Sequence, residues 1–169
     1  MATTADLLVD GFDRIRDLVH GAVDGLPIAS LSWRPAQGAN PIGWLVWHLA
    51  RVQDNHVATA AGLEQRWLAG GWAERFGLPF PHDATGYGQD PSDVGKVTAG
   101  PELLTAYHDA VHAATVDYLR TLDDGDLDRI VDTRWDPPVT LAVRLVSVLS
   151  DDLQHAGQAA YVRGLLGNA

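Results

Sequence analysis

The sequence predicts an all-α protein, an antiparallel four-helix bundle formed by a single domain over residues 1–169. Two observations favour this class. Four segments of about 20 residues carry apolar side chains at helical spacing, and no segment alternates apolar and polar residues as a half-buried strand does. The length of 169 residues is typical of one domain with a substantial core.

The first two helices are expected over residues 3–23 and 41–61. The first segment places Leu8, Phe12, Ile15 and Val19 on one stripe. Before the second segment, Asn40 is a good N-cap and Pro41 fits the first helical position, where its missing N–H is not needed. The second helix therefore begins at about Pro41.

The later half of the chain predicts two more helices, over residues 101–122 and 140–166. Before them lies a long connection over about residues 62–100 that is rich in aromatic and turn-forming residues. Connections of this length are uncommon in compact domains and are usually functional or disordered. The aromatic residues favour order, so this segment is expected to form a lid or pocket wall.

Composition excludes several classes of function. A net charge of −10 without a Lys/Arg cluster argues against nucleic acid as a partner. No apolar run reaches the ~18 residues of a membrane span, and the N-terminus lacks the pattern of a secretion signal. The absence of cysteine excludes disulfides and thiol nucleophiles within the chain. No Gly-x-Ser-x-Gly elbow or phosphate-binding loop occurs. We therefore expect a cytoplasmic protein with neither nucleic-acid nor membrane partners.

A candidate metal site joins the second and fourth predicted helices. Asp151 and His155 are four residues apart and therefore share one helix face. His48, on the second helix, completes a set of three ligands, which leaves room for water or substrate as catalytic sites require. Beside the pair, an apolar row is expected to face the core: Leu141, Leu145, Val146, Leu149, Leu153, Ala156 and Ala160.

Polar residues near this set are candidate supports or substrate contacts. Gln158 follows His155 by one turn and is placed to bind its second ring nitrogen or the substrate. Trp44 lies on the His48 stripe. For Arg51 and Arg144, two roles stay open: binding a substrate carboxylate, or structural ion pairing.

Two alternatives compete with the metal site. The first is that His48 and His155 are satisfied histidines at the core edge and Asp151 is solvated. The second is a rival pair on the third helix, His108 and His112, whose spacing is a familiar metal signature, although this side is expected to face solvent. The other histidines have no partner at ligand spacing: His20, His56 and His82.

Three stretches carry a family resemblance. They are Leu-Ser-Trp-Arg-Pro at 31–35, Asn-Pro-Ile-Gly-Trp-Leu-Val-Trp-His-Leu-Ala-Arg at 40–51, and Asp-Asp-Leu-Gln-His-Ala-Gly-Gln-Ala-Ala-Tyr-Val-Arg-Gly-Leu-Leu at 151–166. With them the chain resembles the DinB-like superfamily, and within it the branch of mycothiol-dependent S-transferases and maleylpyruvate isomerase-like proteins. The resemblance implies a four-helix bundle that holds a divalent metal, often zinc or nickel.

The family's ligands fall on His48, Asp151 and His155. The family more commonly has histidine or glutamate where this chain has Asp151. Because aspartate is shorter, the ion must lie nearer the fourth helix, or Asp151 must bind it through water.

Three functions follow from this reading. The first is a metal-dependent transfer of mycothiol to a small electrophile; since the chain has no cysteine, the thiol must come from a small molecule. The second is a hydrolase that uses metal-bound water, and the third is a bundle that binds a metal or small ligand without turnover. The expected partners are a small thiol and an electrophile. The resemblance also implies a homodimer.

Overall fold

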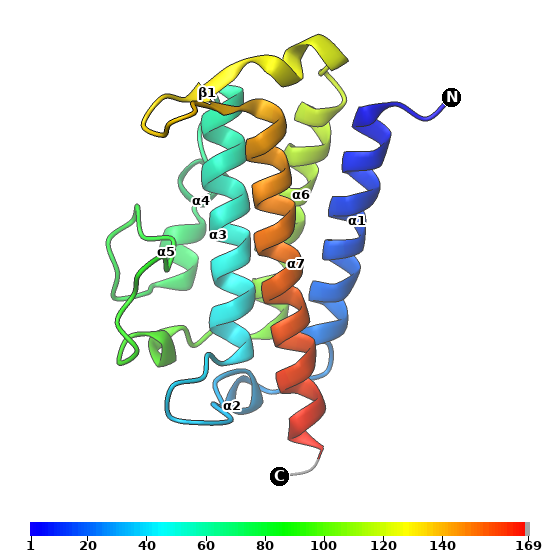
Figure 1. Cartoon of the computed structure of the whole chain (residues 1–169). Coiled ribbons are helices and arrows are strands. Elements are labelled where there is room, and N and C mark those ends of the chain that lie inside the picture. Colours follow the sequence, from blue (N-terminus) through cyan, green and yellow to red (C-terminus); the bar gives the residue numbers. More distant parts are fainter. Residues whose placement is uncertain (168–169) are drawn as a thin grey trace.

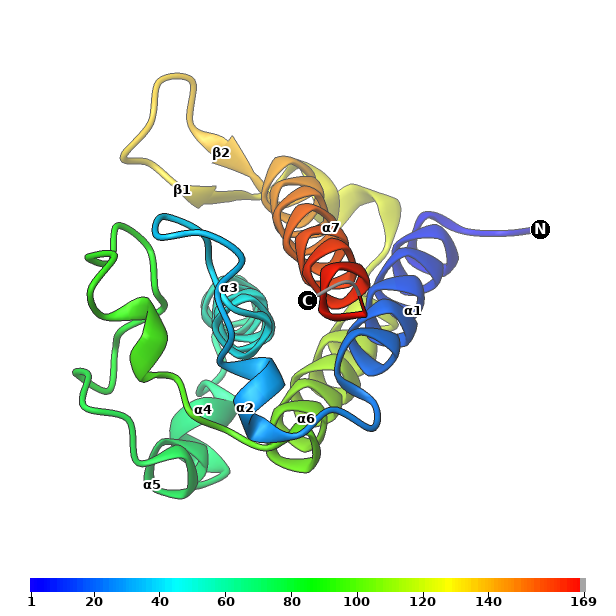
Figure 2. The same ribbon diagram turned by 90° about the horizontal axis from the view of Figure 1, so that it is seen from below.

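The computed structural model describes residues 1–167 and confirms the all-α bundle (Figure 1). Four long helices form it: α1 (Thr4–Val23) and α7 (Leu141–Leu166) run in one direction, and α3 (Ile42–Ala61) and α6 (Pro101–Leu119) run in the opposite direction. The shorter elements are α2 (Ile28–Leu31), α4 (Arg66–Ala69), α5 (Trp72–Phe76), η1 (Val94–Lys96), η2 (Asp124–Asp128), β1 (Ile130–Asp132) and β2 (Val139–Thr140). Viewed along the bundle, α3 packs between α6 and α7, and α1 packs against the same two helices from the opposite side (Figure 2).

The ends of the long helices follow their local chemistry. Thr3 caps α1: its side chain accepts from the Asp6 N–H, and the Asp6 carboxylate accepts from the Thr3 N–H. Thr140 caps α7 by accepting from the Val143 N–H. At α3 the N-cap is Pro41 rather than the expected Asn40, and no side chain of the described residues caps this helix. Helix α6 ends at Leu119, three residues before the expected end.

Helix α3 is the most enclosed element of the bundle. Every residue from Ile42 to Arg51 is buried, because the other long helices cover one side and the connection over 62–100 covers the other (Figure 2). The connection is ordered and buries Trp67, Trp72 and Phe76. Polar side chains on this half of α3 therefore lie in a desolvated environment.

Two features differ from expectation. A small antiparallel sheet, β1 with β2, precedes α7, although no strand was predicted. The buried face of α7 is also rotated from the expected row: Val146 and Leu153 are exposed, whereas Asp152 is fully buried. Aspartate is rarely buried without a partner. The sequence pattern therefore assigned Asp152 to the surface of α7 and assigned Val146 and Leu153 to its core face. Within residues 1–167, no helix combines the length and apolar character needed to cross a membrane.

Candidate metal centre

The structure brings His48, Asp151 and His155 together on facing sides of α3 and α7. One ligand atom from each lies within 4.8 Å of the others. The imidazole rings meet edge to face, with centroids 4.7 Å apart at 78°. Asp151 Oδ1 lies 3.7 Å from His155 Nε2, as the one-turn spacing on α7 predicts. Among the described residues this is the group of three that could hold a metal ion.

The surroundings of His48 leave one ring nitrogen free. His48 is 5% exposed, and its Nδ1 lies 2.5 Å from the Thr85 carbonyl oxygen. A carbonyl only accepts, so Nδ1–H is the donor and Nε2 keeps its lone pair. Burial lowers the pKa of this imidazole; the Thr85 carbonyl raises it, His155 lowers it and Asp151 raises it, with a net downward shift. The neutral ring that results is the form that binds metals.

His155 is oriented in the same way from α7. Its Nδ1 lies 2.9 Å from Gln158 Oε1, one turn further along the helix. With the amide oxygen as acceptor, Nδ1 carries the proton and Nε2 keeps its lone pair. Histidine ligands of metals ordinarily donate their second N–H to such a partner, which sets the tautomer and the ring orientation. Both histidines therefore have this support.

Asp151 supplies the negative charge of the cluster. Its Oδ2 is buried and has no hydrogen-bond partner among the described residues. A buried carboxylate oxygen without a donor is unfavourable, and two neutral imidazoles that carry their protons on Nδ1 offer Asp151 no N–H from Nε2. A divalent cation would satisfy all three ligand atoms at once. Two imidazoles and a carboxylate suit zinc or nickel, so the donor set fits the metal that the resemblance implies.

An aromatic ring and a glycine form the wall behind His48. Trp44 stacks on the imidazole with centroids 4.6 Å apart and an angle of 13°, and its Nε1–H donates to Gln89 Oε1 at 2.6 Å. Gly86 adopts a φ of +90°, and a Cβ built there would lie 2.7 Å from His48 Nδ1. The loop that accepts from His48 thus approaches closely enough to require glycine.

The two arginines have different surroundings. Arg51 is fully buried and donates to the Ala84 carbonyl at 3.1 Å and to Gln65 Oε1 at 2.9 Å. Its Nη1 also lies 3.6 Å from Asp54 Oδ2. Arg51 thus ties the connection over 62–100 to α3 rather than facing an open site. Arg144 is partly exposed and borders a pocket between α3, α7 and the β1–β2 hairpin.

The rival pair on α6 has a different environment from the expected one. His108 is fully buried, so the prediction that this side faces solvent is wrong for it. Both ring nitrogens of His108 lack partners within residues 1–167. His112 Nε2 instead meets Asp13 Oδ1 at 2.7 Å, and His20 Nε2 meets Asp109 Oδ1 at 2.9 Å. These contacts join α6 to α1.

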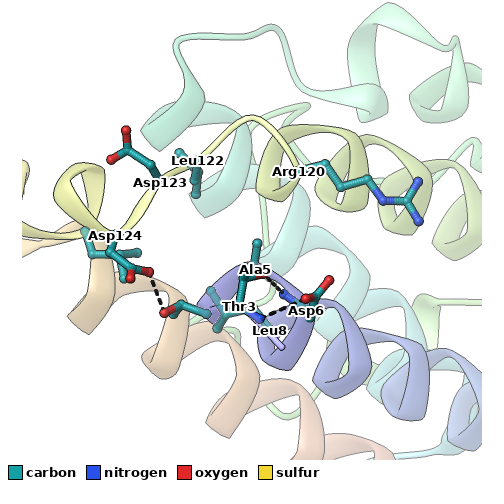
Figure 3. A pocket seen from close by; sticks show the side chains of 10 residues that line it. Thr3, Ala5, Asp6, Leu8, Arg120, Leu122, Asp123 and Asp124 are labelled. Atoms are coloured by element: carbon teal, nitrogen blue, oxygen red, sulfur yellow. Dashed lines mark hydrogen bonds between the residues drawn. The ribbon is translucent and has the colours of Figure 1, made fainter. Parts of the chain in front are cut away.

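A pocket of about 390 Å³ opens at the end of the bundle where α1 begins and α6 ends (Figure 3). Apart from Arg120, its polar side chains already form structural contacts. Thr3 and Asp6 form the capping box of α1, and the Thr4 hydroxyl donates to Asp124 Oδ1 at 2.6 Å. Arg120 extends away from these groups (Figure 3). The pocket has no cluster of ligand atoms comparable to that between α3 and α7.

Sequence reasoning missed the loop that holds His48. Thr85 and Gly86 lie in a stretch without periodicity, so no pattern linked them to α3. The available signal was the pair of closely spaced glycines in Thr85-Gly86-Tyr87-Gly88, because glycine allows a positive φ and a close approach of the backbone. In the structure both glycines have a positive φ. The partners of Arg144, which are His56 and Asp132, were also missed, since their contacts join segments far apart in sequence.

Comparison with known proteins places the chain in a family. The profile described as the DinB superfamily matches residues 11–159. The crystal structure of a conserved protein from Enterococcus faecalis superimposes with a TM-score of 0.92 at 30% sequence identity, covering 100% of both chains. No curated protein matches the chain.

Proposed function

The chain belongs to the DinB superfamily, and on that premise we propose that it is a divalent-metal-dependent enzyme that transfers a small thiol, mycothiol, to an electrophile. One observation carries the metal site. One ring nitrogen of each histidine and one carboxylate oxygen lie within 4.8 Å of one another, while the Nδ1 of each histidine already has an acceptor. The proposed ligands are His48, Asp151 and His155, and the proposed metal is zinc or nickel.

The thiol is proposed to come from outside the chain, because the chain contains no cysteine. When bound, a divalent cation lowers the pKa of a coordinated thiol, so that thiolate exists at neutral pH. In the transfer, the sulfur loses its proton to solvent and forms a bond to the electrophilic carbon. The displaced group leaves with the bonding electron pair. The proposed setting is the cytoplasm, where small thiols remain reduced.

The residues of the chain orient this chemistry and protect it from water. Thr85 and Gln158 fix the two imidazoles, and Trp44 covers one face of His48. His48 is almost fully buried and Asp151 is partly exposed. Small molecules therefore reach the cluster from the α7 side, while α3 forms its floor. The homodimer implied by the resemblance is part of this proposal.

A comparison of co-substrates tests the proposal. The purified protein is assayed with mycothiol, with other biological thiols and without thiol, against a panel of electrophiles and esters. The expected result is transfer that requires mycothiol, stops after removal of the metal by a chelator, and returns with zinc or nickel. Ester turnover without thiol would instead identify a hydrolase. Metal-loaded protein that is silent on every substrate would identify a binding protein.

A further inference from the structure

A second pocket lies beside the candidate metal centre, between α3, α7 and the β1–β2 hairpin. Its volume is about 510 Å³, and its polar walls include His56, Asp132, Arg134 and Arg144. The hairpin lies beside the C-terminal end of α3 and the N-terminal end of α7 (Figure 1). None of these side chains has a part in the metal centre described above.

The pocket contains more positive than negative charge. Arg144 donates to Asp132 Oδ2 at 2.8 Å, and Arg134 donates to both oxygens of the same carboxylate at 3.0 and 2.8 Å. Hydrogen bonds from Arg134 hold the pKa of Asp132 well below its usual range, so Asp132 remains ionised. Two guanidinium groups thus share one carboxylate, which leaves one positive charge unbalanced. The pocket therefore has a local excess of positive charge, although the whole chain has a net charge of −10.

His56 adds a neutral donor to the same wall. Its Nδ1 lies 3.2 Å from Arg144 Nη1. A guanidinium only donates, so Nδ1 must accept and the proton resides on Nε2. Burial, followed by Arg144, lowers the pKa of His56, so the ring remains neutral. The free polar groups of His56, Arg134 and Arg144 are therefore hydrogen-bond donors, which suit an anion.

The pocket lies toward the C-terminal end of α3 and the N-terminal end of α7 relative to the metal centre, because these two helices run antiparallel. Arg144 precedes Asp151 by seven residues on α7, or about 10 Å at 1.5 Å per residue. His56 follows His48 by eight residues on α3, or about 12 Å. The charge of Asp151 also acts on His56, whose pKa it raises. Both helices thus place the cationic pocket about two turns from the three candidate ligands.

The other side of the metal centre has the opposite character. A hollow of about 490 Å³ there is lined mainly by apolar groups, among them Leu45, Tyr161 and Val162, together with Gln158. Among residues 1–167, no arginine or lysine lines it. A ligand at the metal centre therefore meets an apolar hollow in one direction and a cationic pocket in the other.

We propose that the pocket at Arg144, Arg134 and His56 binds the carboxylate of a ligand whose reacting end lies about 10 Å away at His48, Asp151 and His155. The ligand class is thus an elongated organic acid, with its anion and its reactive sulfur or electrophilic carbon at opposite ends. The identity of the reacting end rests on the proposed function. The anion site does not.

The test compares matched acids and alcohols on the cobalt-substituted protein. Mercaptooctanoate, whose extended chain spans the required distance, is compared with mercaptooctanol, its neutral analogue. Sulfur-to-cobalt charge-transfer absorption reports the thiol end, and the ratio of the two Kd values reports the anionic end. We expect the acid to bind about tenfold more tightly than the alcohol, as charge-assisted hydrogen bonds predict. The shorter mercaptopropionate should have no such advantage over mercaptopropanol.

Substitutions of the pocket arginines test whether the tighter binding of the acid depends on this pocket. Arg144→Gln and the largely exposed Arg134→Gln should each reduce the ratio of Kd values, whereas Arg144→Lys should retain part of it. Arg14→Gln is the matched control, since Arg14 is exposed and pairs with Asp10 on α1. Equal binding of acid and alcohol by the unaltered protein would overturn the pocket proposal, as would an advantage that survives both glutamine variants.

A metal-free arm separates the two proposals. Octanoate is added to the protein without metal, and the side-chain Nε–H signals of Arg134 and Arg144 are followed by NMR. If no thiol gives a charge-transfer band, the thiol function fails. Shifts of these arginine signals by octanoate, but not by octanol, would still support the anion site; unchanged signals would overturn it.

Discussion

Replacing Gly86 with alanine tests how the loop over α3 controls the metal centre. The new Cβ would lie 2.7 Å from His48 Nδ1, 3.0 Å from Trp44 Cζ2 and 3.1 Å from Trp47 Cζ3. The first of these contacts is about 0.7 Å shorter than ordinary van der Waals contact. Trp47 is 1% exposed and packed in the core, so the His48 ring or the loop must move. Either movement breaks the hydrogen bond from His48 to the Thr85 carbonyl.

The size of the effect follows from these contacts. A φ of +90° is strained for alanine, at about 1–2 kcal/mol, and the lost hydrogen bond adds about 1 kcal/mol. We therefore expect a loss of about 2–3 kcal/mol in the free energy of unfolding. Because Thr85 sets the tautomer of His48, metal affinity should fall about 10- to 100-fold.

Gly88→Ala provides the matched control. Gly88 also has a positive φ, of +66°, but a Cβ there would meet nothing within 4 Å. This variant should lose only about 1 kcal/mol of stability from backbone strain and should keep its metal affinity. The assays are urea unfolding and competition for zinc against a chromogenic chelator. Equal zinc affinity in the two variants would refute the argument that Gly86 positions His48.

Three further predictions concern stability and assembly. His108 is fully buried without a hydrogen-bond partner among the described residues, and burial lowers its pKa from 6.5 to about 3. Below pH 6.5 the unfolded chain therefore binds a proton at His108 that the folded chain does not. As the pH falls, the free energy of unfolding of the unaltered protein should decrease by about 1.4 kcal/mol per pH unit relative to that of His108→Leu. Urea unfolding between pH 6 and pH 4 measures this, and parallel stability curves for the two proteins would contradict it. Tyr107→Phe should cost about 1–2 kcal/mol, because the buried Tyr107 hydroxyl donates to Asp54 Oδ2 at 2.9 Å, whereas Tyr161→Phe at an exposed site should be neutral in the same unfolding assay. Light scattering should give twice the mass of the chain if the proposed homodimer forms; the mass of one chain would contradict it.

The long helices were predictable because amphipathic spacing is a local property. The pair of Asp151 and His155 was predictable for the same reason, since residues one turn apart must share a face. The face of α7 was misplaced because Asp152, which is buried with both carboxylate oxygens unpaired, looks like a surface residue in sequence. The approach of Thr85 and Gly86 to His48 depends on a loop conformation that no periodicity encodes.

The central claim is that His48, Asp151 and His155 hold one divalent metal ion. The most direct measurement is the metal content of protein purified without a histidine tag, compared among the unaltered chain and single variants. Zinc or nickel should be present at about one ion per chain, should be lost in His48→Ala and His155→Ala, and should be reduced in Asp151→Asn. It should persist in the His108→Ala/His112→Ala double variant. Loss of the metal from that double variant, with retention in His155→Ala, would contradict the account.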